Sequence, residues 1–252
     1  MVESDPRPSG WQTMPHILQG RYAVKRMGVG DIPSLMQLRN VVLAELGHPD
    51  AYVREDNEEA FILDHCGQRG ETIGLFSAGP STHLIAYAMV CFPGSEDSDN
   101  LGVTVGLPVD ELDRVGILSG CMVAKEYRGH GLQLQLLLLR QLLCSSHGRT
   151  HCLSMISLHN THSRFNLFRL GMVLRWIGVL SPYGLRRQLA YIDQETPMQF
   201  DMLAIQEADP LNFERQVDLS RAGWWAIRER VNSQGHQVLE FARPLPACRS
   251  AS

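Results

Sequence analysis

A short apolar run, a glycine turn and a leucine-rich run follow one another in residues 117–139, and this order constrains the fold more than any other feature of the chain. Ile117–Val123 is typical of a buried strand, and the leucines that begin at Leu132 are typical of a helix. Gly129 and Gly131 stand between them, where they let the backbone approach a ligand without an intervening Cβ. A helix N-terminus directly after such a turn presents unpaired N–H groups and the positive end of the helix dipole. The stretch therefore predicts a strand–turn–helix unit that binds an anion, most often a phosphate.

A second strand and helix follow directly along the chain. Residues 152–158, CLSMISL, are apolar and predict another strand. The helix after them is expected to end at Gly171, because helix ends often need a positive φ angle. Further strands are predicted at 21–27, 72–77 and 83–91, and in a hairpin of 173–180 with 185–192; further helices are predicted after the N-cap residue Asp31 and over 56–65. This alternation indicates a mixed α/β sheet.

The chain is longer than one compact domain of ordinary size needs to be. We expect residues 1–20 to form a flexible leader, 21–193 the main domain and 194–252 a β/α extension that docks on it. In the extension we expect a strand at 199–205, a helix capped by Asp209 and a hairpin of 224–231 with 236–241. Sheet extension, a cover over part of the main domain and a homodimer contact are the roles that we consider for it.

Residues 123–132, VAKEYRGHGL, resemble the acetyl-CoA signature of the GNAT superfamily of N-acetyltransferases, which reads as an apolar strand, R-G-x-G-x-G/A and a helix. Arg128, Gly129 and Gly131 match this pattern. The last position departs from it, because Gln133 stands where the family has a small residue. The resemblance implies a mixed, mostly antiparallel central sheet with two splayed parallel strands and flanking helices.

The second strand–helix unit resembles the element that follows the signature in the same family, N-x-x-(A/S) and a helix that ends in L-G-F. Asn160, Ser163, Leu170 and Gly171 match, and Met172 takes the usual place of phenylalanine. In the family, the asparagine and the small residue lie beside the pantetheine arm of coenzyme A.

The resemblance implies that acetyl-CoA, or another short acyl-CoA, is the co-substrate, and that a primary amine of a small molecule or peptide attacks its thioester directly. The turn and helix amides would hold the pyrophosphate, and a strand backbone would pair with the pantetheine amides. The residues assigned to the cofactor in this way are Met122, Val123, Arg128, Gly129, His130, Gly131, Leu132, Gln133, Asn160 and Ser163.

Proton transfer is less well defined by the sequence. Many relatives have a tyrosine that protonates the leaving thiolate, and this chain has Leu167 in that place. Ser163, Tyr183 and a bound water are the substitutes that we consider. The candidate general bases are Glu111, Asp113, Glu126, His159 and His162. A non-catalytic acyl-CoA-binding sensor or partner module with the same fold is the alternative.

Two regions suggest opposite charges for the acceptor. Tyr183, Arg186 and Arg187 lie at a hairpin turn that faces the acceptor in the family, and arginines there favour an anionic acceptor. The loop of residues 47–54 should form the opposite wall, and its acid and aromatic residues favour an amine. The residues assigned to the acceptor are His48, Tyr52, Tyr183 and Arg186.

Composition narrows the partners and the compartment. A formal net charge of −4 gives no reason to expect nucleic acid, and no apolar run is long enough to suggest a membrane. The first residues do not read as a signal peptide, and the six cysteines are scattered, so we expect a cytoplasmic protein with reduced thiols. His147, His151 and Cys152 lack a second pair of ligands, and we expect no metal.

Overall fold

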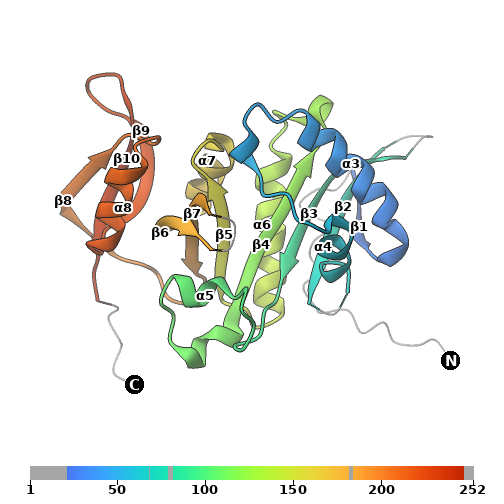
Figure 1. The fold of residues 1–252 in the computed structure, drawn as a ribbon, viewed down its shortest axis with the longest axis horizontal. Helices are drawn as coiled ribbons and strands as arrows, with labels where there is room; N and C mark the ends of the chain where they lie inside the picture. Colours follow the sequence, from blue (N-terminus) through green and yellow to red (C-terminus); the bar gives the residue numbers. More distant parts are fainter. Residues whose placement is uncertain (1–21, 68, 79–81, 182–183, 247–252) are drawn as a thin grey trace. The chain divides into compact units, whose positions relative to one another are not determined.

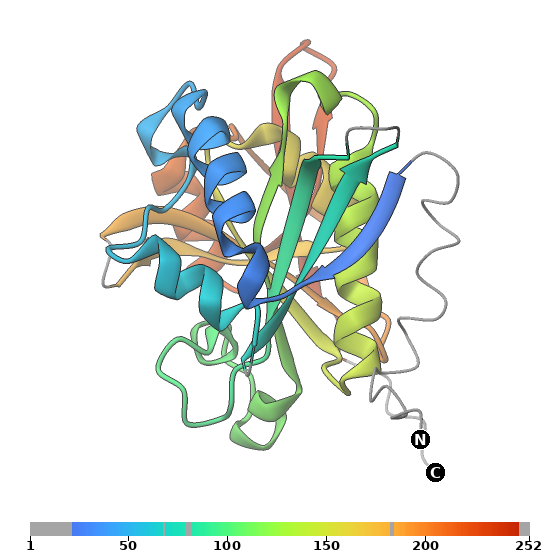
Figure 2. The same ribbon diagram turned by 90° about the vertical axis from the view of Figure 1, so that its right-hand side faces the viewer.

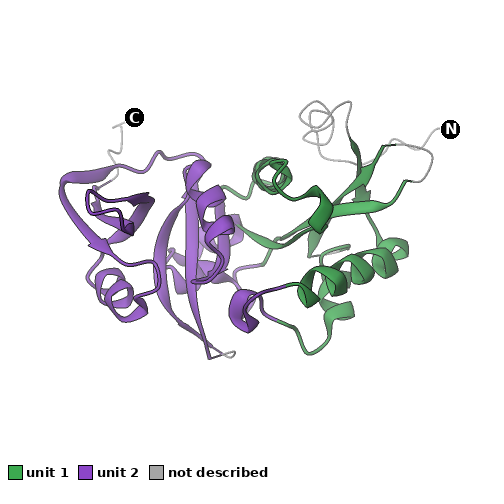
Figure 3. Ribbon diagram, turned by 90° about the horizontal axis from the view of Figure 1, so that it is seen from above, with its two compact units in different colours: residues 1–45, 54–93, 116–150 green, residues 46–53, 94–115, 151–252 purple. Residues whose placement is uncertain are grey.

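The computed structural model describes residues 22–67, 69–78, 82–181 and 184–246 (Figure 1). The leader, residues 79–81, the candidate Tyr183 and the sixth cysteine, Cys248, lie outside the described residues. The chain falls into two compact units, each assembled from separate stretches of sequence (Figure 3). Unit 1 contains residues 1–45, 54–93 and 116–150, and unit 2 contains residues 46–53, 94–115 and 151–252.

Unit 1 is an antiparallel sheet with helices on both faces. Its strands lie in the order β1 (Tyr22–Met27), β2 (Gly70–Ser77), β3 (Leu84–Cys91) and β4 (Val115–Val123). Its helices are η1 (Val29–Asp31), α3 (Ile32–Ala44), α4 (Glu58–Asp64), η4 (Lys125–Tyr127) and α6 (Leu132–Ser146). Helix α6 covers one face of the sheet, and α3 and α4 cover the other (Figures 2 and 3). Because both faces are covered, β3 is an unbroken apolar run that is buried along nearly its whole length.

A β-bulge interrupts the pairing of β4 with β3. The register passes from Ala88↔Cys121 to Val90↔Leu118, so one residue of β3, Met89, lies opposite two residues of β4. The extra residue falls at Ser119 or its neighbour, in the middle of the strand that the sequence placed before the glycine turn. A bulge bends a strand and increases its twist, and bulges are common beside functional sites.

The strands of unit 2 are also paired antiparallel. Its strands lie in the order β5 (His151–Ser157), β7 (Leu185–Asp193), β6 (Val173–Leu180), β9 (Trp225–Val231), β10 (Gln237–Pro244) and β8 (Phe200–Ala208). Its helices are η2 (Pro49–Ala51), α5 (Leu101–Thr104), η3 (Val109–Arg114), α7 (Thr161–Arg169) and α8 (Phe213–Arg221). The C-terminal residues join this sheet through the pairing of β6 with β9, at Leu174↔Ala226.

Two predicted helix starts are wrong, and side-chain hydrogen bonds explain both. Helix α8 begins after Asn212, whose Oδ1 accepts from the N–H of Arg215 at 3.1 Å. The predicted cap, Asp209, instead accepts from the N–H of Leu211 and forms a local turn before the helix. Likewise α4 is capped by Asn57 and begins at residue 58 rather than 56. At both helix starts, two residues that can act as N-caps lie close together in the sequence, and the residue type alone does not show which of them caps the helix.

The five cysteines in the described part of the chain are all free thiols. Across those same residues, no helix combines the length and the apolar character needed to cross a membrane.

Candidate functional site

The turn before α6 leaves the N-terminus of that helix open. Gly129 and Gly131 have φ angles of 80° and 75°, in the region that favours glycine. Gly131 is the N-cap, so no side chain caps the helix, and no acidic residue occupies the first turn. Leu132 is buried and anchors that turn to the core, while Gln133 after it is half-buried. The backbone N–H groups and the positive end of the helix dipole are therefore open at the place where the sequence predicts an anion-binding site.

Arg128 lies at the same turn but is already engaged. Its Nη2 is 2.8 Å from a carboxylate oxygen of Glu45, and its Nε donates to the carbonyl of Val123 at 3.0 Å. Both side chains of the ion pair are partly exposed, and such a pair contributes only about 0–1 kcal/mol. An anion at the turn could therefore compete with Glu45 for the guanidinium. His130 is exposed between the two glycines.

The backbone direction of β4 distinguishes the two residues assigned to the pantetheine arm. The N–H of Ala124 donates to the carbonyl of Ile85 at 2.8 Å, and Met122 is paired with Tyr87 two residues earlier. Because amide direction alternates along a strand, the amide of Met122 faces β3 and that of Val123 faces away from it. Of the two, only Val123 could offer its N–H to a ligand beside the strand.

Side chains from two other elements hold the bulge in β4. Arg140 of α6 donates to the carbonyl of Ser119 at 2.9 Å, and the Oγ of Ser119 lies 2.9 Å from Nε2 of His65. Burial lowers the pKa of His65, which favours the neutral imidazole. These two residues fix the shape of the strand before the turn, and nothing in the local sequence pattern identified them.

The start of α7 carries the second pair of matched residues. Asn160 is the N-cap, and its Oδ1 accepts from the N–H of Ser163 at 3.1 Å. Gly171 has a φ angle of 78° just after the helix, as predicted. Leu167 is only 4% exposed, so the position that carries a tyrosine in many GNAT enzymes is here part of the apolar core.

A pocket of about 120 Å³ lies at the end of β5. Its lining residues are Asp50, Ser157, Leu158, His159, Arg186 and Leu211. Asp50 of the loop 47–54 and Arg186 at the start of β7, two regions that the sequence analysis assigned to the acceptor, therefore line one pocket within unit 2. Arg186 is largely exposed there, 3.3 Å from a carboxylate oxygen of Glu214. Tyr52 is half-buried on the same loop and does not line the pocket.

Two histidines stack at this pocket. The rings of His48 and His159 are 3.6 Å apart between centroids and 19° from parallel. Nδ1 of His48 accepts from the N–H of Asp50 at 3.1 Å, which leaves the proton of a neutral His48 on Nε2. Desolvation and the charges of His48 and Arg187 lower the pKa of His159, and Asp50 opposes them. His159 is therefore biased towards the neutral form, which can accept a proton.

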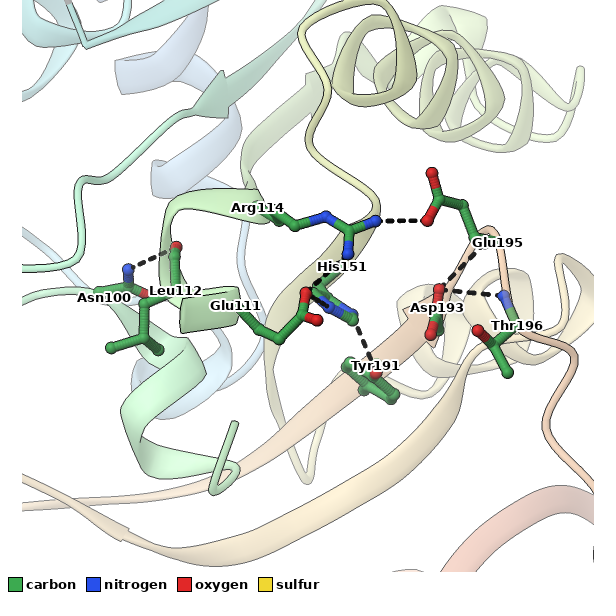
Figure 4. Close-up of polar contacts among 9 residues, drawn as sticks. All are labelled: Asn100, Glu111, Leu112, Arg114, His151, Tyr191, Asp193, Glu195 and Thr196. Carbon is green, nitrogen blue, oxygen red and sulfur yellow. Dashed lines mark hydrogen bonds and ion pairs between the residues drawn. The ribbon is translucent and has the colours of Figure 1, made fainter. Parts of the chain in front are cut away.

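Unit 2 contains a second polar cluster, which holds η3 against the start of β5 (Figure 4). Glu111 points toward His151 and lies 3.1 Å from its Nε2, and Nδ1 of His151 lies 3.0 Å from the hydroxyl of Tyr191. Arg114 points toward Glu195 and also pairs with Glu111. The hydrogen bond from His151 and the charge of Arg114 lower the pKa of Glu111, so it is a poor general base. Burial raises the pKa of Tyr191 to about 12.

The histidines that suggested a metal site have other partners. His147 lies 2.9 Å from a carboxylate oxygen of Glu71, and His151 lies beside Glu111. Within the described ranges, no three histidine, cysteine or acidic side chains are grouped so that they could hold a metal ion.

No family model matches the sequence, and no curated protein matches it. Solved structures do match the fold. NAA60 of Arabidopsis thaliana in complex with acetyl-CoA has a TM-score of 0.52 at 12% identity, over 68% of this chain and 97% of its own. The putative acetyltransferase yncA of Salmonella typhimurium, solved with its cofactor acetyl-CoA, has a TM-score of 0.50 at 15% identity, over 69% of this chain and 95% of its own. An N-acetyltransferase of Staphylococcus aureus has a TM-score of 0.50 at 12% identity, over 69% of this chain and 99% of its own.

These structures are too distant in sequence to carry over an activity. They do confirm the fold that the motifs at the α6 turn and at α7 predicted. The chain is a mixed α/β protein with the fold of the GNAT acetyltransferases.

Proposed function

We propose that the protein is an acyl-CoA-dependent N-acyltransferase that uses acetyl-CoA and a primary amine. The observation that carries this proposal is the open N-terminus of α6, preceded by two glycines with positive φ, in a chain with the GNAT fold. A diphosphate is the kind of group that such a turn holds best, because it accepts several N–H hydrogen bonds and interacts favourably with the helix dipole.

The reaction needs no covalent enzyme intermediate. The amine nitrogen attacks the thioester carbonyl carbon, the C–S bond breaks, and coenzyme A leaves as the thiolate. The N–H of Val123, which faces away from β3, would stabilise the negative charge that develops on the carbonyl oxygen. The amine loses one proton, and the departing sulfur gains one.

Protonation of the leaving group is a weak requirement. A thiol has a pKa of about 8.5, so the thiolate leaves readily without a strong acid. The burial of Leu167 is consistent with a site that acts mainly by positioning the two substrates. Ser163, at the first turn of α7, is the motif-matched residue that carries a hydroxyl.

The first test is titration calorimetry with acetyl-CoA, with ATP as the control nucleotide. We expect micromolar binding of acetyl-CoA alone. Gly131→Val should abolish that binding, because a β-branched residue at a φ angle of 75° is strained and would deform the turn. Gly235→Val is the matched control, since Gly235 has a φ angle of 81° and equally open surroundings, but lies in the β9–β10 turn.

Acyl transfer by the purified protein to a broad panel of amines tests catalysis separately. Binding of acetyl-CoA without transfer to any amine would favour the non-catalytic sensor or partner module. If the wild type and Gly235→Val both fail to bind acetyl-CoA, the fold is present without its cofactor and the proposal is wrong.

A further inference from the structure

Arg187 is a buried cation that forms no ion pair with any of the described residues. It lies near the start of β7, opposite Ser157 of β5 and Gly178 of β6, and is 2% exposed. Its Nη1 donates to the carbonyl of Arg186 at 2.8 Å, and its buried Nη2 has no hydrogen-bond acceptor in the described structure. No carboxylate there comes within 4.0 Å of this guanidinium. A buried charge of this kind destabilises a fold unless something else pairs with it.

The surroundings of Arg187 indicate what that missing partner is. Two residues that line the pocket at the end of β5, Asp50 and His159, lie close enough for their charges to interact with that of Arg187. Among the described lining residues Asp50 is the only acid, and its charge acts on both His159 and Arg187. Arg187 itself lies beside the pocket, opposite the lining residue Ser157 in the sheet. Arg186, which also pairs with Glu214, and Arg187 therefore lie near one lining carboxylate. A small molecule that carries both an anion and an amine would complement these charges.

The pocket is also next to the residues that the resemblance assigns to the acyl donor. His159 directly precedes Asn160, and Ser163 lies within the first turn of the same helix. An amine bound beside His159 would thus lie next to Asn160, one of the residues expected to contact the pantetheine arm. This step rests on the proposed function.

We propose that the acceptor is a small amino carboxylate, whose carboxylate pairs with Arg187 and whose amine is held between Asp50 and His159. The planar guanidinium can bind a carboxylate through two parallel hydrogen bonds. Asp50 attracts the ammonium form of the amine. His159 then removes a proton from it, and the nitrogen lone pair forms the bond to the acyl carbon as the C–S bond breaks towards sulfur.

The test is a kinetic comparison of matched acceptors. Glycine, β-alanine and γ-aminobutyrate are each assayed beside their own carboxamide, with acetyl-CoA as donor and thiol release as the readout. In Arg187→Gln, the KM for the preferred carboxylate should rise about ten- to a hundred-fold, which corresponds to the loss of one hydrogen-bonded charge pair. The KM for the carboxamide should change little, and so should acetyl-CoA binding.

Two further variants serve as controls. Arg187→Lys retains the charge without the paired donors and should give an intermediate KM. Arg169→Gln removes the same charge from an exposed position on α7 and should leave both KM values unchanged. The proposal is overturned if carboxylate and carboxamide acceptors are used equally well by the wild type, or if Arg187→Gln affects both alike. Either result would still leave acyl transfer itself established.

Discussion

Arg164 and Arg187 are both almost completely buried in unit 2, and only Arg164 is paired with a carboxylate. Nε and Nη2 of Arg164 donate to the two carboxylate oxygens of Glu229 at 2.8 and 3.1 Å, and Nη1 donates to the carbonyl of Leu158 at 2.9 Å. Arg187 has one backbone acceptor and no carboxylate among the described residues. The two arginines therefore differ in whether the fold itself supplies their counter-charge.

The difference separates a structural arginine from a binding arginine. Arg164 joins α7 to β9, and its hydrogen bonds are complete without any ligand. Arg187 is already placed in the buried position that a bound carboxylate requires, so its desolvation is part of the folded state. Proteins commonly hold such unfavourable groups at functional sites and offset them elsewhere in the fold.

The largest expected effect is on Arg164. Arg164→Met should destabilise the protein by about 3–5 kcal/mol, because it leaves the carboxylate of Glu229 buried and unpaired. Urea unfolding followed by circular dichroism measures this loss. Arg169→Gln, on the exposed face of the same helix, controls for the charge change and should cost less than about 0.5 kcal/mol. A small loss in Arg164→Met would mean that the buried pair is not structural.

Arg187→Met should change the free energy of unfolding by less than Arg164→Met does, and in the opposite direction. Removing an unpaired buried cation and keeping its volume should stabilise the unliganded protein by about 1 kcal/mol. The same unfolding measurement, made without any acceptor present, reports it. A loss of several kcal/mol would show that Arg187 supports the fold as Arg164 does, and the contrast between them would disappear.

The glycine turn before α6 could be predicted from the sequence, but the difference between Arg164 and Arg187 could not. Gly129 and Gly131 could be placed because few other residues adopt their φ angles, and the helix after them followed from its leucines. The partner of Arg164 lies 65 residues away, and no local pattern connects the two. The bulge at Ser119 was missed for a similar reason, since Arg140 and His65 hold it from other elements.

Some of the residues around the pocket at the end of β5 could be named from the sequence. Loop 47–54 and the start of β7 were assigned to opposite walls, and His48, Asp50 and Arg186 do lie around one pocket or its histidine stack. Their charges appeared contradictory in the sequence because one wall favoured an anion and the other an amine. In the structure Asp50 and Arg186 line the same small pocket, and the amino carboxylate that we propose would match both charges.

The third prediction uses the pKa of His159 to measure the charge of Arg187 directly. Arg187 lowers this pKa and Asp50 raises it. In Arg187→Gln the pKa should therefore rise, and in Asp50→Asn it should fall, relative to the wild type. Titration of the imidazole C–H resonances by NMR gives the values, with His236 in the β9–β10 turn as an internal reference.

The same shifts should appear in the pH dependence of kcat/KM if His159 accepts the proton of the amine. Only its neutral form is active, so activity falls as the pH drops through its pKa. The acid limb should move to higher pH in Arg187→Gln and to lower pH in Asp50→Asn, measured with a carboxamide acceptor. The amine's own titration is identical in all three proteins and cannot produce a difference between them. NMR shifts of the expected sign with an unmoved acid limb would place His159 beside Arg187 but exclude it as the base.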